Sequence, residues 1–293
     1  MSRPEHNPKG ATSFYNKKEA LKYSTNNKMK QTQSILSKRA IQLLQIPAGV
    51  NGLILDIGCG SGFSHQKLLR EGHLIVGTDI NRTMLDESVR HTTNRLNRAK
   101  GGSDGISNSS DNNNIRNKKR KHQYDNNIHN MKNMKNNNTT YGIADLLESD
   151  MGDGLGFRRN IFDGVISISA LQWLCYPSKR HKGKGNQQSK TKNKNTYNTN
   201  NKKKKKNKKY NSGNDNNVNP HGVEERLKRF FRTLRTCLRK KAKAVLQFYP
   251  ETAIDCYKIC KIANEVGFNG GLLIDYPAHM DGKKYYLVIS FDG

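Results

Sequence analysis

Hydrophobic positions along the chain follow two alternating patterns. Short apolar runs, many of them β-branched, predict buried strands over residues 53–55, 74–80, 143–149, 161–169, 244–249, 272–275 and 285–289. Apolar residues at three- and four-residue spacing predict helices over 31–46, 64–71, 83–98, 223–238 and 254–266, with a short apolar turn or helix over 170–175. Strands that alternate with helices of these lengths predict an α/β fold with a parallel sheet and right-handed crossovers.

Two long segments, 101–140 and 178–222, break this pattern. Both are rich in Asn and Lys and have no periodic apolar face, so we expect them to be disordered low-complexity inserts. The second follows the fourth strand, near the carboxyl edge where such sheets bind ligands. It contains a run of five lysines, 202–206, which fits binding to RNA phosphates or a nuclear import signal. Sequence drift in an AT-rich genome is the simpler explanation of this run.

The charge changes this picture only after the inserts are set aside. The formal net charge is +28 over 293 residues, which suggests a polyanionic partner, and the inserts contribute +4 and +13 of it. The remaining 208 residues carry +11 and have the size of one ordinary domain. We therefore predict an N-terminal segment and helix over 1–50, followed by one domain over 51–293 that the two inserts interrupt.

Several classes of protein are disfavoured. No apolar run reaches 18 residues, so we expect no transmembrane helix, and the first ten residues lack the apolar stretch of a secretory signal. The five cysteines are odd in number and scattered, which favours reduced thiols in an intracellular protein. Cys256 and Cys260 could share a helix face, but no further Cys or His pair completes a zinc site. We expect core packing there and no metal.

The most informative stretch is a glycine loop, Asp56-x-Gly58-x-Gly60-x-Gly62, which follows a predicted strand and precedes a helix. Its spacing fits neither the dinucleotide fingerprint nor a phosphate-binding P-loop. Asp79 ends the second strand, where a carboxylate suits the hydroxyls of a ribose. Asp150 and Met151, after the third strand, are placed to contact an adenine amino group and ring.

These three motifs resemble the S-adenosylmethionine-binding motifs of class I methyltransferases. The resemblance implies a Rossmann-like sheet of seven mostly parallel strands with helices on both faces, and S-adenosyl-L-methionine as cofactor. The cofactor-binding residues that it implies are Asp56, Gly58, Cys59, Gly60, Asp79, Ile80, Asp150, Met151 and Ser167. We expect residues 1–50 to cover this site, with Tyr15 and Tyr23 closing over the cofactor; packing for stability alone is an equal alternative for the two tyrosines.

A closer resemblance comes from segments outside the cofactor motifs. Residues 1–5, 14–23, 162–175, 247–250, 267–272 and 283–288 look like those of the eukaryotic methyltransferases that modify guanine N7 in 18S ribosomal RNA. The departures are the two inserts and a basic tail that family members usually carry after the last strand. The resemblance implies methylation of 18S rRNA during small-subunit maturation, in the nucleus (nucleolus) and cytoplasm.

The chemistry of that reaction agrees with the residues. Guanine N7 has an in-plane lone pair and no proton, so attack on the cofactor methyl needs no general base. We therefore expect positioning of the two reactants to carry the reaction, and we assign no catalytic residue. Substrate-binding candidates are Trp173, Tyr249 and Pro250. Trp173 would stack on the target base, although a core role beneath its turn fits the sequence equally well.

The resemblance also implies a protein partner, a small zinc-binding activator subunit that adds a strand beside the edge strand at 143–147. An uncovered apolar edge favours aggregation, so we expect poor solubility without the partner. Two other functions stay open: methylation of a small molecule or protein by a chain that shares only the cofactor motifs, and a ribosome-assembly factor whose binding matters more than its catalysis.

Overall fold

The computed structural model describes residues 3–7, 10–100, 144–176, 222–276 and 282–292. The first predicted insert, almost all of the second, and the lysine run 202–206 lie outside these ranges.

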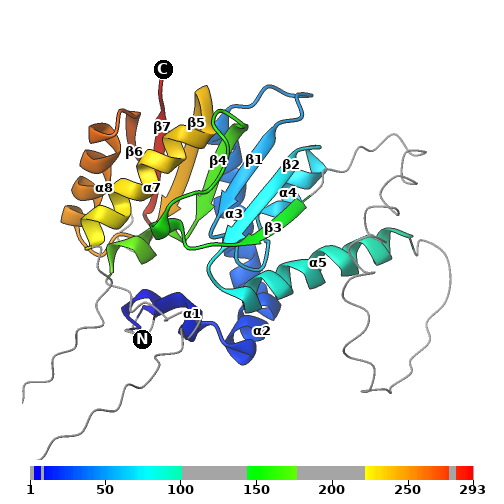
Figure 1. The fold of residues 1–293 in the computed structure, drawn as a ribbon. Helices are drawn as coiled ribbons and strands as arrows, with labels where there is room; N and C mark the ends of the chain where they lie inside the picture. Colours follow the sequence, from blue (N-terminus) through cyan, green and yellow to red (C-terminus); the bar gives the residue numbers. More distant parts are fainter. Residues whose placement is uncertain (1–2, 8–9, 101–143, 177–221, 277–281, 293) are drawn as a thin grey trace, which may run out of the picture.

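The described strands form one seven-stranded sheet in the order β3-β2-β1-β4-β5-β7-β6 (Figure 1). The strands are β1 (Leu53–Ile57), β2 (Leu74–Asp79), β3 (Ala144–Glu148), β4 (Phe162–Ile168), β5 (Leu238–Phe248), β6 (Asn269–Asp275) and β7 (Lys284–Ser290). The pairs among β1 to β5 are parallel, whereas β7 runs antiparallel to both β5 and β6. The predicted seven-stranded, mostly parallel sheet of the class I methyltransferase fold is confirmed.

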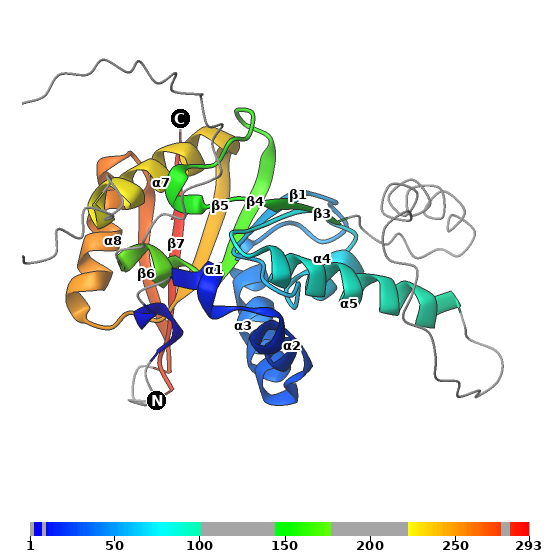
Figure 2. The same ribbon diagram turned by 60° about the horizontal axis from the view of Figure 1, so that its bottom comes forward.

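Helices cover both faces of the sheet (Figure 2). On one face α7 (Val223–Cys237) and α8 (Ala253–Glu265) bury a cluster that includes Phe230, Phe231 and Leu234. On the other face α3 (Asn27–Leu44) and α4 (His65–Arg70) bury a second cluster that includes Leu36 and Leu68. The connection from β2 to β3 begins with α5 (Arg82–Lys100). Apolar packing therefore stabilises the sheet on both faces, so the loops at its strand ends have a rigid support.

The N-terminal segment is more helical than the sequence pattern predicts. Before α3 lie a 3-10 helix η1 (Pro4–His6) and two short helices, α1 (Gly10–Phe14) and α2 (Lys17–Thr25). The α3 helix begins four residues earlier than the predicted residue 31, because the Asn26 side chain accepts a hydrogen bond from Met29 N at 3.1 Å and caps the first turn. The Asn16 side chain caps α2 in the same way.

Two strands also extend beyond their predicted starts. β5 begins at Leu238 instead of residue 244, and β6 begins at Asn269 instead of residue 272. The first part of β5 is polar and largely exposed, and Lys241 has a positive φ of 64° there. A strand without a buried face has no apolar alternation, so periodicity gives no signal for it.

No helix among the described residues is both long and apolar enough to span a bilayer. The five cysteines are free thiols, and Cys256 and Cys260 lie partly buried against the core layer beneath α8, as expected for packing residues.

Candidate cofactor and substrate site

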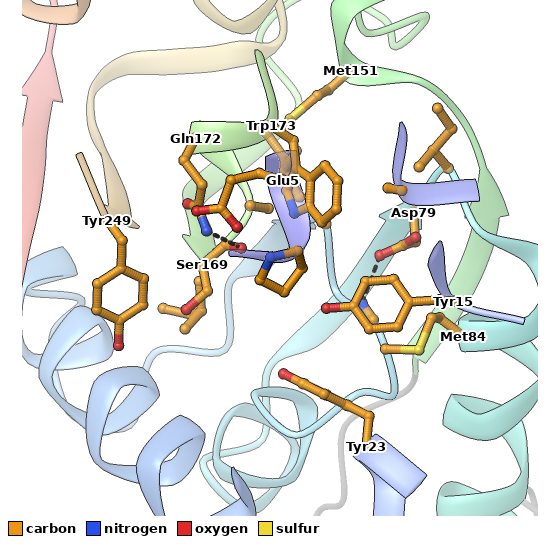
Figure 3. Close-up of a pocket in the computed structure, with 18 of the residues that line it drawn as sticks. Glu5, Tyr15, Tyr23, Asp79, Met84, Met151, Ser169, Gln172, Trp173 and Tyr249 are labelled. Atoms are coloured by element: carbon orange, nitrogen blue, oxygen red, sulfur yellow. Dashed lines mark hydrogen bonds between the residues drawn. The ribbon is translucent and has the colours of Figure 1, made fainter. Parts of the chain in front are cut away.

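A cavity of about 480 Å³ lies at the carboxyl ends of the parallel strands. Its lining comes from the loops that follow β1, β2, β3, β4 and β5 and from the N-terminal elements η1, α1, α2 and α3 (Figure 3). The volume suits a small organic ligand. The parallel topology thus brings residues that are far apart in the sequence to one place.

The glycine loop after β1 forms one wall of the cavity. Gly58 has φ of +68°, and a Cβ added there would overlap the Cβ of Ala170 in the loop after β4. Gly60 has φ of +54°, and its amide donates a hydrogen bond to Asp79 Oδ2 at 2.9 Å. The Cys59 amide ties the same loop to β2 by donating to the Thr78 carbonyl at 2.9 Å. Glycine is therefore required here by backbone conformation and by close packing.

Asp79 ends β2 and lies beside the glycine loop. Its Oδ1 accepts a hydrogen bond from Asn81 N at 2.8 Å, while Oδ2 accepts the one from Gly60. Desolvation by the surrounding protein raises the pKa of Asp79 to about 6, against the lowering effect of these two bonds. Each oxygen keeps a further acceptor position, so the carboxylate can bind a pair of hydroxyl donors above that pH.

The loop that carries Asp150 follows β3 and lies next to the end of β2. Ser149 N donates to the Asp79 carbonyl at 3.0 Å, and Asp150 caps the 3-10 helix η3 (Met151–Asp153) by accepting from Gly152 N at 2.8 Å. Arg226 of α7 donates from Nη2 to Asp150 Oδ1 at 3.1 Å. The Arg226 side chain is 5% exposed, and its Nε and Nη1 find no hydrogen-bond partner among the described residues. This buried arginine thereby fixes the loop that carries Asp150 and Met151.

The N-terminal segment crosses the mouth of the cavity and is fastened on both sides of it. On the β2 side, Asn81 Nδ2 donates to the carbonyls of Ala11, Thr12 and Tyr15 at 3.2, 3.2 and 3.0 Å. On the β5 side, Arg3 Nη1 donates to the carbonyls of Tyr249 and Pro250 at 3.3 and 3.1 Å. The segment is thus a wall of the cavity and not a separate tail.

Three aromatic rings from different elements meet in that wall (Figure 3). Tyr15 lies 5.8 Å from Tyr23 and 6.3 Å from Trp173, measured between ring centroids. Burial raises the pKa of both tyrosines above the ordinary value, so both are neutral phenols near pH 7. Trp173, in the 3-10 helix η4 (Leu171–Cys175), is only half-buried and lines the cavity. Its ring is therefore open to a ligand, which a purely core role would not provide.

The loop after β4 is held in a strained conformation. Ser169 has a positive φ of 58°, and both its amide and its hydroxyl donate to Gln247 Oε1 at 2.9 Å. Gln172 Nε2 donates to the Ser169 carbonyl at 2.9 Å, while Gln172 Oε1 has no partner among the described residues. A non-glycine residue in this backbone region is uncommon and clusters at functional sites.

Comparisons with known proteins assign the chain to a family. A family model described as a methyltransferase domain matches residues 55–103. The 18S rRNA (guanine-N(7))-methyltransferase of Schizosaccharomyces pombe is 33% identical over 293 residues, covering 100% of this chain and 76% of that protein. The mouse (Mus musculus) 18S rRNA (guanine-N(7))-methyltransferase is 31% identical over 287 residues, covering 98% and 70%. The 18S rRNA (guanine(1575)-N(7))-methyltransferase of Saccharomyces cerevisiae is 32% identical over 291 residues, covering 99% and 73%. The chain belongs to the 18S rRNA (guanine-N(7))-methyltransferase family.

The family that the sequence segments resemble is thus confirmed, and so is S-adenosylmethionine as the cofactor of this methyltransferase. The residues of the cavity fit that molecule. The Asp79 carboxylate offers acceptors for hydroxyls, and the glycines leave the loop backbone open to the cavity, where a Cβ on Gly60 would come 3.2 Å from Met84 Cε.

Most of the residues predicted for the site of the methyltransferase line this cavity. They are Gly58, Gly60, Asp79, Ile80, Asp150, Met151, Tyr15, Tyr23, Trp173 and Tyr249.

Four predicted residues lie outside the lining. Asp56 is buried beneath the loop, where one carboxylate oxygen accepts from Ser64 Oγ and lies 3.2 Å from His65 Nε2. The Cys59 side chain is buried toward β2, and burial raises the pKa of its thiol. Ser167 Oγ donates to the Ile57 carbonyl at 2.8 Å, so it braces β1 against β4. Pro250 takes part only through its carbonyl, which accepts from Arg3. These four support the walls of the site without facing the cavity.

The cavity is also lined by residues for which the sequence predicted no role in the site, among them Glu5, Gln33, Gln172 and Arg226. For Arg226 a signal was available. It occupies a position on the apolar face of its helix, three residues after Val223 and four before Phe230, where a charged side chain demands a buried partner. Glu5 lies in residues 1–5, which carry part of the family resemblance, but this segment has no periodicity that would assign the Glu5 side chain to the site.

Proposed function

We propose that this chain transfers the methyl group of S-adenosylmethionine to N7 of a guanine in 18S rRNA during small-subunit maturation. The observation that carries the proposal is the match, over essentially the whole chain, to relatives named for that reaction. The site supports it, because a cofactor-binding wall and a wall with a half-buried Trp173 belong to one cavity. The N-terminal elements that complete this cavity are part of the matched length.

In this proposal the β1, β2 and β3 ends hold the cofactor. Asp79 accepts hydrogen bonds from the ribose hydroxyls, and the open backbone around Gly58 and Gly60 receives the amino-acid part. Met151 and the Asp150 loop, which Arg226 fixes from behind, contact the adenine. Tyr15 and Tyr23 line the same cavity, and their electron-rich rings would stabilise the cofactor's positive sulfur by a cation–π interaction.

The cofactor supplies a methyl group on a positively charged sulfur, which is an electrophile. The protein does not have to remove a proton, because guanine N7 already carries a free lone pair. Its residues have to orient the base and exclude water, and positioning of this kind can supply several kcal/mol of the barrier. The Trp173 ring stacks on the target base and Tyr249 closes the far wall.

We also propose that a small zinc-binding activator subunit pairs with the edge strand β3, and that the protein works in the nucleus, including the nucleolus, and in the cytoplasm. Among the described strands β3 pairs only with β2, so its other edge is open, and Leu147 there is 47% exposed. An open edge with an exposed apolar side chain is the geometry that strand addition requires.

A transfer assay tests the proposed reaction against the alternatives. The chain and its partner are incubated with methyl-labelled S-adenosylmethionine and with small ribosomal subunits that lack the modification. We expect the label in the RNA fraction. Label in ribosomal protein or in small molecules would favour the alternative methyltransferase class, and binding to the subunits without any transfer would favour a role in assembly alone.

A further inference from the structure

Glu5 is a buried residue whose carboxylate accepts no hydrogen bond from the part of the chain that the structure describes. It lies in η1, lines the cavity and is only 6% exposed. Its one ion pair with a described residue joins Arg3 Nη1 and Glu5 Oε1 at 3.9 Å, which is too long for a hydrogen bond. The residue lines the cavity, where donors on a ligand would offset the cost of taking the carboxylate out of water. Its carboxylate oxygens are therefore placed to accept N–H groups that a ligand brings into the cavity.

The position of Glu5 assigns it to the substrate side of the cavity. The same Arg3 nitrogen that approaches Glu5 donates to the carbonyls of Tyr249 and Pro250, at the end of β5. Figure 3 shows Glu5 beside Gln172 and Trp173, with Asp79 on the far side of Trp173. The ribose-binding carboxylate and the Glu5 carboxylate thus belong to different ends of the cavity.

The proposed reaction requires a group that distinguishes guanine from adenine. Both purines carry a lone pair at N7, so the attack on the methyl group does not select between them. They differ on the Watson–Crick edge, across the ring from N7. Guanine presents two adjacent donors there, N1–H and the N2 amino group, whereas adenine presents an acceptor at N1. A carboxylate accepts two donors side by side and repels an acceptor.

We propose that the Glu5 carboxylate accepts the N1–H and N2–H hydrogen bonds of the target guanine. Trp173 lies against the face of the base, and N7 points away from Glu5 toward the cofactor end of the cavity. Glu5 is thereby the residue that selects guanine over adenine. This inference rests on the proposed methylation of guanine N7, and Arg3 holds the carboxylate in place from the β5 side.

The test begins with the unmodified chain and its partner. A short RNA hairpin that contains the target guanosine is compared with the same hairpin carrying inosine, which keeps N7, O6 and N1–H but lacks the N2 amino group. We expect kcat/KM to fall about 10- to 100-fold for inosine, since one hydrogen bond to a charged acceptor is lost. Equal rates for the two hairpins would overturn the role of Glu5. Absence of transfer to either hairpin and also to small subunits that lack the modification would overturn the proposed function itself.

Substitution then assigns the discrimination to Glu5. Gln keeps one acceptor but presents an amide N–H to the guanine amino group, so in Glu5→Gln the preference for guanosine over inosine should fall to within about threefold. The matched control Glu224→Gln, on the exposed surface of α7, should keep the full preference. The Kd for S-adenosylmethionine, measured on the same samples, should stay within about twofold in both variants. An unchanged preference for guanosine over inosine in Glu5→Gln would contradict the inference. A large loss of cofactor affinity in that variant would also contradict it, because it would indicate that Glu5 binds the cofactor's ammonium group.

Discussion

Asp79 gives the site its clearest dependence on pH. Desolvation raises the pKa of this carboxyl to about 6. In the proposed function the ribose hydroxyls donate to this carboxyl, and they bind its ionised form more strongly than its protonated form, which keeps only part of the acceptor capacity. We therefore expect the affinity for S-adenosylmethionine to be nearly constant from pH 6.5 to 7.5 and to weaken below pH 6, by at most about tenfold per pH unit. Calorimetric titration from pH 5 to 7.5 measures this profile.

The variant Asp79→Asn serves as the control for that profile. An amide does not titrate in this range, so the variant should bind the cofactor weakly and with little change between pH 5 and 7.5. A wild-type profile without the decline, or the same decline in Asp79→Asn, would exclude Asp79 as the titrating group.

At the scale of single residues, the residue types of a motif predict which loop forms a site. They predict less well which side chains of that loop face the cavity. Gly60 and Asp79 could be predicted because a glycine loop and a strand-end carboxylate have a fixed relation to the sheet. Asp56 carries the same signal, yet its carboxylate turns beneath the loop to Ser64 and His65. The direction of a side chain at a strand end depends on neighbours that only the folded structure supplies.

The packing of α7 against η3 positions the Asp150 loop, which is the end of the cavity proposed for the adenine. Arg226 bridges from α7 to Asp150, and Gly152 has no side chain at the point where a Cβ would overlap the guanidinium. In Arg226→Ala we expect the free energy of unfolding to fall by about 2–3 kcal/mol, less than for a fully buried pair because the Asp150 side chain is 23% exposed. The affinity for S-adenosylmethionine should weaken about tenfold, because the Asp150 loop loses its support.

Chemical denaturation and cofactor titration measure both effects. The matched control is Arg232→Ala on the same helix, where the side chain is 61% exposed and its ion pair to Glu225 is 3.9 Å long. That variant should change stability by less than about 1 kcal/mol. Equal effects of the two substitutions would show that α7 does not hold the Asp150 loop through Arg226.

Elements with a buried face could be predicted from the sequence. The start of an element could not be predicted where it depends on a local cap, or where the element extends into an exposed segment. The amphipathic pattern of Leu227, Phe230 and Leu234 gives α7 directly, since these side chains fill one core cluster. The first turn of α3 depends on the Asn26 cap. The first part of β5 has no apolar alternation and contains the positive φ of Lys241.

For the whole molecule, the open edge of β3 has consequences for solubility. A strand that pairs on one side only can pair with another chain, and a lysine on such an edge opposes this. The chain expressed alone should therefore be largely insoluble, and it should become soluble with the zinc-binding partner. Leu147→Lys should raise the soluble fraction of the chain alone about two- to threefold and weaken capture of the partner.

The soluble fraction and partner co-purification are measured together. Ile254→Lys is the control, because Ile254 is 61% exposed on α8, which packs next to β6 at the other end of the sheet. It should change neither readout. Good solubility and full activity of the isolated chain would contradict the proposed partner.

The most direct measurement of the central claim is chemical cleavage of 18S rRNA at 7-methylguanine. Small subunits that lack the modification are treated with S-adenosylmethionine, the partner and one of three chains: the unmodified one, Gly58→Glu or Gly156→Glu. A side chain at Gly58 would overlap Ala170 and fill the loop, whereas Gly156 is exposed with open space around it. We predict cleavage at one guanine with the unmodified chain and with Gly156→Glu, and none with Gly58→Glu. No cleavage with the unmodified chain, or undiminished cleavage with Gly58→Glu, would contradict the account.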